Sequence, residues 1–116
     1  MNLEIGVTYY RLTFADAKMT MPGLEPVVYV GKNLFDEPTS EEVYYFQNTV
    51  SVVRFGILGG NEDVYVEAFK KDDLGSSVTT LEQAITIMQE ANERYIREGK
   101  PKLKKANGKW KTIHTS

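Results

Sequence analysis

Alternating apolar and polar residues dominate the chain up to about residue 70. Apolar side chains recur at every second position in short segments bounded by glycine, proline or polar turns, a pattern typical of β-strands with one buried face. The pattern predicts five strands, at about residues 3–14, 27–35, 43–47, 50–57 and 64–70. Because they follow one another with no helix between them, they should pair as an antiparallel meander.

Three local signals refine these strands. Within residues 3–14 the alternation changes phase between Tyr9 and Tyr10, which predicts either a β-bulge there or two short strands. Residues 15–25 contain Met-Pro-Gly and are typical of a loop. Asn48-Thr49 predicts a tight hairpin turn between the strands at 43–47 and 50–57.

Helical periodicity appears only late in the chain, at about residues 80–98. Thr79 with Glu82, and Thr80 with Gln83, each match the capping-box pattern of a helix start, and Gly99 indicates its end. Steps of three and four residues predict one buried stripe. The stripe contains Leu81, Ala84, Ile85, Met88, Ala91, Tyr95 and Ile96.

A run of strands followed by a helix predicts the α+β class. We expect a single domain over residues 1–99, built as an antiparallel β-meander of four to six strands with one long C-terminal helix packed on it. The alternative is a curled, SH3-like, partly open barrel with the helix plugging one end. Residues 100–116 are expected to form a basic C-terminal tail or hairpin, because Asn107-Gly108 is a strong hairpin signal.

Charge divides the chain in the same place. Residues 1–99 hold 8 lysines and arginines against 16 acidic residues, a net charge of −8, whereas residues 100–116 hold six lysines and no carboxylate. The tail could therefore contact phosphates, dock on an acidic surface of its own or a neighbouring chain, or remain solvated. The acidic body opposes nucleic acid, so only weak binding is expected there.

Composition excludes several kinds of chemistry. The chain has no cysteine, so it can form neither disulfides, nor thiolate zinc sites, nor a cysteine nucleophile. The chain also has no signal-peptide pattern and no segment with the roughly 18 to 20 apolar residues that span a bilayer. We therefore expect a cytoplasmic protein with no membrane partner.

No residue pattern predicts a reaction. The single histidine, His114, lies near the C-terminus, and Gly56 to Gly60 lacks the Lys-Ser/Thr ending of a phosphate-binding loop. Carboxylates occur in pairs within or beside predicted turns, where solvated charge is the simplest interpretation. We predict no catalytic residue, metal or cofactor; an enzyme using loop carboxylates is a third possibility.

Exposed aromatic rings and the tail are the candidate binding residues. If adjacent tyrosines both lie in strands, one ring of each pair should face away from the core, where it can contact a partner. These considerations predict a noncatalytic protein-interaction or regulatory module that binds another protein or itself; the alternative is weak nucleic-acid binding through the tail. The candidates are Tyr10, Tyr44, Tyr45, Lys104, Lys105, Lys109, Trp110 and Lys111.

Overall fold

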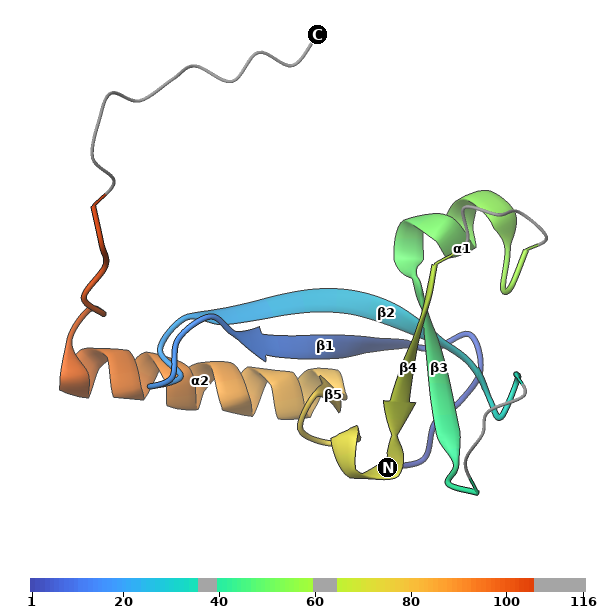
Figure 1. Cartoon of the computed structure of the whole chain (residues 1–116), viewed down its shortest axis with the longest axis horizontal. Helices are drawn as coiled ribbons and strands as arrows, with labels where there is room; N and C mark the ends of the chain where they lie inside the picture. Colours follow the sequence, from blue (N-terminus) through green and yellow to red (C-terminus); the bar gives the residue numbers. More distant parts are fainter. Residues whose placement is uncertain (36–39, 60–64, 106–116) are drawn as a thin grey trace, which may run out of the picture.

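One five-stranded antiparallel sheet forms the centre of the protein, with strand order β4-β3-β2-β1-β5 (Figure 1). The computed structural model describes residues 1–35, 40–59 and 65–105. The strands are β1 (Thr8–Phe14), β2 (Pro22–Lys32), β3 (Val43–Asn48), β4 (Val66–Lys70) and β5 (Val78–Thr79). The helices are α1 (Thr49–Phe55), the short 3-10 turn η1 (Lys71–Asp73) and α2 (Leu81–Glu98). Strands β1 to β4 are neighbours in chain order, which confirms the meander and the α+β class.

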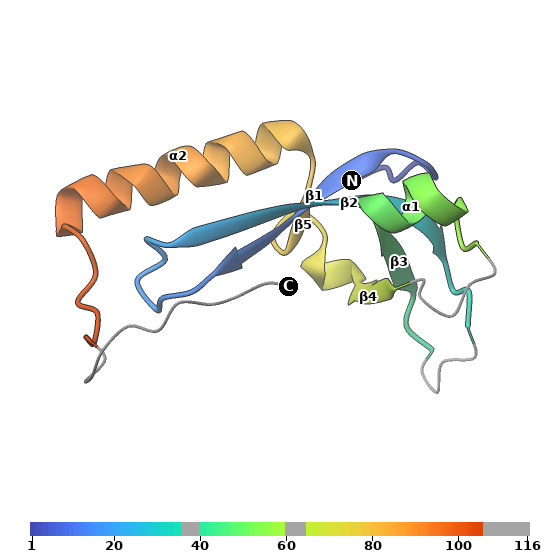
Figure 2. The ribbon, with the colours of Figure 1, turned by 90° about the horizontal axis from the view of Figure 1, so that it is seen from above.

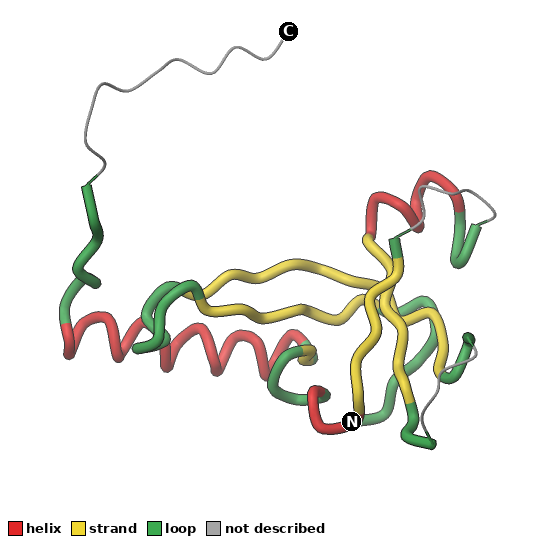
Figure 3. Tube along the Cα trace, viewed as in Figure 1, coloured by secondary structure: helices red, strands yellow, loops and turns green. Residues whose placement is uncertain are grey.

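The sheet is strongly curled. The guanidinium of Arg11 on β1 reaches the Glu67 carboxylate on β4 at 3.3 Å, although β2 and β3 lie between these strands in the sheet order. Figure 3 shows the same curl as a steep crossing of β3 and β4 over the long β1–β2 hairpin. No pairing joins β4 to β5 in the part of the chain that the structure describes, so the curled sheet has two open edges.

Each face of the sheet carries its own apolar cluster. Alternate residues of paired strands point to the same face, which places Tyr9, Val27, Tyr29, Phe46, Phe69 and Val78 together on the inner side of the curl. The opposite face holds Val28, Val30, Val43 and Tyr45, and α1 covers them through Val52. Both faces therefore contribute to the core.

The predicted strand at residues 50–57 and its hairpin turn are wrong. The segment forms α1, and Asn48 begins the helix as its N-cap, since its side-chain oxygen accepts hydrogen bonds from the backbone N–H groups of Val50 and Ser51. The strand that pairs with β3 on this side is β4. An N-cap asparagine and tertiary contacts thus override the strand preference of a valine-rich run.

The structure also differs from the predicted positions of the bulge and of the loop. Pairing of β1 with β2 is continuous from Thr8 to Phe14, so Tyr9 and Tyr10 simply point to opposite faces. The irregularity lies instead in β2, between Tyr29 and Gly31. Gly31 adopts a φ of 140°, and a Cβ there would lie 2.9 Å from the Leu34 side chain, which explains the glycine. Strand β2 begins at Pro22, inside the predicted loop.

Helix α2 packs beside the β1–β2 hairpin, on β1 and β5 (Figure 2). Its start is as predicted: Thr80 and Gln83 exchange side-chain to backbone hydrogen bonds at 3.2 and 3.0 Å. Its end is Gly99, which has a φ of 79°. The division of the chain into a domain at residues 1–99 and a tail at 100–116 stays a prediction, because residues 106–116 lie outside the described part.

Candidate functional site

An apolar groove runs along α2, between this helix and Leu24 on β2. Its volume is about 290 Å³. The lining side chains are Leu24, Leu81, Ala84, Ile85, Met88, Gln89 and Asn92. None of these side chains titrates, so the groove can bind through apolar packing and through two amides.

The groove exists because α2 packs on the sheet through its small residues. Ala84 and Ala91 are buried, which brings the helix backbone close to β1. The larger apolar side chains of the predicted stripe remain outside this contact, and Leu81 and Ile85 are each 48% exposed. The helix is confirmed, but the prediction that its whole apolar stripe is buried is wrong.

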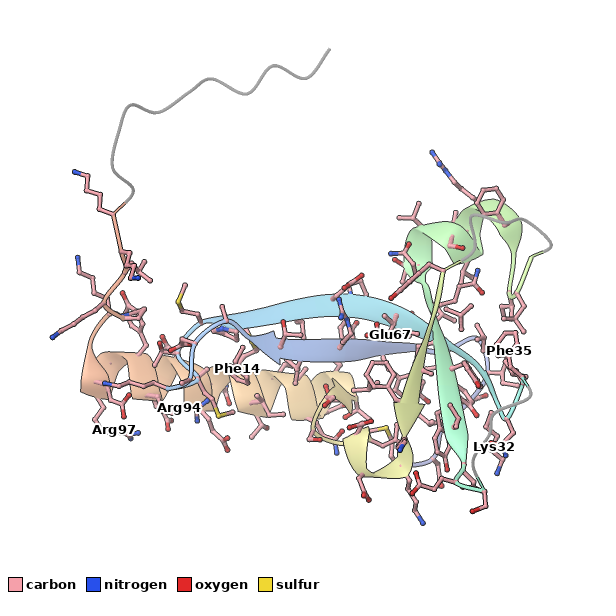
Figure 4. All side chains as sticks on the ribbon, viewed as in Figure 1. Phe14, Lys32, Phe35, Glu67, Arg94 and Arg97 are labelled. Atoms are coloured by element: carbon pink, nitrogen blue, oxygen red, sulfur yellow. The ribbon has the colours of Figure 1, made fainter. Side chains whose placement is uncertain are left out.

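Arg94 anchors the C-terminal half of α2. Its Nε donates to the backbone oxygen of Met19 at 3.1 Å, and its guanidinium lies 5.8 Å from the centre of the Phe14 ring. Figure 4 shows Arg94 beside Phe14 and Arg97 near the end of the helix. These contacts fix the turn after β1 against the helix, although none of the three residues lines the groove itself.

A second apolar surface surrounds α1. Val50, Val53 and Tyr65 are exposed there, beside a cavity of about 410 Å³ that also includes Asn48, Ser51 and Arg54. This cavity is larger than the α2 groove but more polar in its lining. Its lining includes Tyr65, the first described residue after the gap at residues 60–64. We therefore take the α2 groove as the candidate site.

The main charged cluster lies on the inner side of the curled sheet. Arg11 donates to both Glu25 and Glu67, and Glu67 lies over the middle of the β1–β2 hairpin (Figure 4). The hydrogen bond to Glu25 is the main reason that the pKa of Arg11 is raised. The cluster joins β1, β2 and β4 through one guanidinium between two carboxylates, which is a structural role.

The structure does not bring the predicted tyrosines together as one exposed patch. Tyr45 is 3% exposed in the cluster beneath α1, and Phe35 packs edge-on against it with 5.0 Å between ring centroids. Tyr10 is half-buried on the same face of the sheet. Tyr44 is half-buried on the inner face, where its hydroxyl donates to Glu42 at 2.7 Å and its pKa is raised by that bond. Because both faces are covered, neither ring of the Tyr44–Tyr45 pair projects far into solvent.

Of the predicted tail residues, the structure describes two. Lys104 and Lys105 are exposed, as a tail that contacts a partner requires. Lys109, Trp110 and Lys111 lie outside the described residues. Binding through any of these residues stays a prediction.

Residues that sequence reasoning missed are Leu24 on β2 and the exposed side of α2. Leu24 was expected in a loop, and the α2 stripe was expected to be buried. A usable signal was present in the stripe itself, where Ala84 and Ala91 stand one helical repeat of seven apart. Small residues at such spacing indicate where a helix approaches its neighbour most closely. The larger apolar residues beside them then lie outside that contact.

Comparisons with known proteins leave the groove as the main guide to function. No protein-family model matches the chain, and neither curated proteins nor solved structures give a significant match. Within residues 1–35, 40–59 and 65–105, no three acidic or histidine side chains are arranged to hold a metal ion. No helix in these same ranges has both the length and the apolar character needed to cross a membrane.

The turn between β1 and β2 gives a testable pH dependence. Asp16 accepts the Thr20 hydroxyl at 2.6 Å, and this bond, with further bonds from the Thr20 and Met21 backbone, lowers the Asp16 pKa. Because the Asp16 pKa is lower in the folded than in the unfolded chain, the carboxylate stabilises the folded state fully at pH values above the unfolded pKa. This stabilisation is lost as the pH falls through the folded pKa. We expect Thr20→Val to raise the Asp16 pKa toward its ordinary value, measured by carboxyl NMR titration. An unchanged Asp16 pKa in the variant would show that the hydroxyl does not set it.

Proposed function

We propose that this protein is a noncatalytic protein-interaction module that binds a helical segment of a protein partner in the α2 groove. The observation that carries the proposal is the exposure of large apolar side chains along α2, next to a line of buried alanines. Monomeric proteins rarely leave such contiguous apolar surface open to water. A helix packed in the groove would cover it in the way that helices fill apolar grooves elsewhere.

The shape of the groove supports a helix as the ligand. Its two walls are the side of α2 and Leu24 of β2, and its lining places the small Ala84 among larger apolar side chains. Ridges of side chains on one helix fit between such side chains on another at interaxial distances of about 8–10 Å. Gln89 and Asn92 supply hydrogen-bonding groups at the groove wall, which fix the register of a bound segment.

Site-specific photocrosslinking in the native cell tests this proposal. The full-length chain would carry p-benzoylphenylalanine in place of Ile85, which lines the groove, or in place of Thr86, its exposed neighbour outside the lining. We expect adducts of defined mass from position 85 and at least about fivefold less from position 86. Equal adduct yields from both positions, or no adduct from position 85, would contradict binding in the groove.

A further inference from the structure

Five side chains of α2, four of them exposed and one half-buried, follow alternating steps of four and three residues. The positions are Leu81, Ile85, Met88, Asn92 and Tyr95, which we call the α2 seam. This spacing is the a/d pattern of a coiled coil, in which each side chain inserts between four residues of a facing helix. A seam of this kind is complementary to another helix with the same spacing.

The seam lies beside the sheet contact of α2 and is distinct from it. Ala84 and Ala91, which pack on the sheet, each precede a seam residue by one position. In the heptad pattern these alanines occupy the g positions. The sheet therefore packs on the g side of the helix, and the a and d residues of the seam remain outside this contact. Ile96, the most exposed apolar residue of α2, lies on the side of the seam opposite to the alanines. Residues on one helix thus serve two separate contacts.

We propose that the α2 seam pairs with α2 of a second copy of this chain, in antiparallel orientation. This inference rests on the proposed function and names its partner. In an antiparallel coiled coil each a position packs opposite a d position of the other helix, so Ile85 lies opposite Tyr95 and Met88 lies opposite Asn92 of the second copy. The same surface of each copy is then used by the other, as a twofold axis requires.

Charge favours this orientation. The first turn of α2 carries Glu82. Its last turn carries Arg97 and Glu98, and the basic character of this end comes from Lys100, Lys102, Lys104 and Lys105, which follow the helix. An antiparallel pair places each acidic first turn next to the basic end of the other helix, and it also opposes the two helix dipoles. A parallel pair would instead gather the lysines at positions 100, 102, 104 and 105 of both copies at one end, where like charges repel.

The expected dimer is reversible. A single pair of 18-residue helices is about 27 Å long, and such a contact with the adjoining Leu24 walls is at the small end of specific interfaces. Asn92 within the seam lowers stability further, because a polar residue at an a position weakens a coiled coil. The dissociation constant of the dimer is therefore expected in the micromolar range, and the molecular mass should be measured over a range of protein concentrations.

Sedimentation equilibrium of the full-length chain tests whether the partner is a second copy of the chain. We expect a mass near 13.2 kDa at low concentration that rises to twice this value at roughly 100 μM or above. Ile85→Glu buries a charge in the seam and should weaken dimerisation at least about tenfold. Thr86→Glu adds the same charge outside the seam and should leave it nearly unchanged. Both positions are exposed, so circular dichroism should show intact folds.

Disulfide trapping tests the orientation. The chain has no native cysteine, so each introduced thiol is unique. Chains carrying Ile85→Cys, mixed with chains carrying Tyr95→Cys, should form a mixed disulfide on oxidation, whereas Ile85→Cys chains alone should crosslink at least about fivefold less, because disulfides require Cβ atoms about 4 Å apart. Strong crosslinking of Ile85→Cys chains alone would indicate a parallel pair and overturn the proposal.

The outcomes separate this inference from the proposed function. A chain that stays monomeric at all concentrations, but yields an Ile85 photoadduct with a different protein, overturns the second copy as partner and leaves the interaction module standing. A chain that neither dimerises nor gives an adduct overturns both. Dimerisation that Ile85→Glu and Thr86→Glu weaken equally would place the interface away from the seam and also overturn the proposal.

Discussion

Phe46→Ala is expected to lower the free energy of unfolding by about 3–5 kcal/mol. Phe46 is 1% exposed at the centre of the inner cluster, with ring centroids 6.1 Å from Tyr9, 5.4 Å from Tyr29 and 5.6 Å from Phe69. Removing the ring leaves a cavity that three other strands cannot fill without shifting. Because domains of this size have a total stability of about 5–15 kcal/mol, the loss is a large part of it. Urea unfolding followed by circular dichroism measures the change.

Phe35→Ala is the matched control for this experiment. Phe35 is 55% exposed and its main described ring contact is with Tyr45, so its truncation should cost at most about 1 kcal/mol. Similar losses for the two phenylalanines would show that the inner cluster does not dominate stability. A small loss at Phe46 alone would place the core elsewhere.

Local periodicity was sufficient to predict most of the sheet. Strands β1, β3 and β4 and helix α2 lie within the predicted ranges or close to them, because each has one clearly buried face or one strong cap. The α2 boundaries were the most accurate, since Thr80 and Gly99 stop the helix through hydrogen bonds and backbone geometry that depend on a few adjacent residues. Such local determinants are visible in the sequence.

The features of the fold that depend on contacts between distant residues could not be predicted from the sequence. The valine-rich segment after Asn48 has the composition of a strand, and nothing within it indicates that β3 would pair with β4 instead. The curl of the sheet, which allows Arg11 to reach Glu67 from a distant strand, likewise depends on contacts between residues 56 positions apart. A sequence pattern with a period of two or four residues carries no information about such pairs.

The candidate site was predicted only in part. The apolar stripe of α2 was recognised, but the choice of its buried side depended on the alanine line that packs on β1. The tyrosine pairs were expected to place one ring outward because one face of the sheet was assumed to meet water. The structure covers both faces, so Tyr44 and Tyr45 each contact a cluster.

Gln47 explains how the segment after β3 becomes a helix. Its side chain is fully buried and makes three hydrogen bonds: its Nε2 donates to the Ser51 hydroxyl at 2.9 Å and to the Gly56 carbonyl at 3.1 Å, and its Oε1 accepts from the Leu58 backbone at 2.8 Å. One amide therefore holds the first turn of α1, its end and the chain that follows. Buried polar groups rarely occur without such a complete set of partners.

Gln47→Met should therefore lower the free energy of unfolding by about 1–3 kcal/mol, because it keeps the side-chain volume but removes the partner of the Ser51 hydroxyl and of the Leu58 N–H. Hydrogen exchange should show at least about tenfold faster exchange at the Leu58 amide, with a smaller change in the β1–β2 hairpin. Gln89→Met, at an exposed glutamine of α2, should change stability by at most about 0.5 kcal/mol. If α1 keeps its exchange protection in Gln47→Met, the cap at Asn48 alone is sufficient to override the strand preference of the valines, and the buried amide serves only to join β3 to the chain after α1.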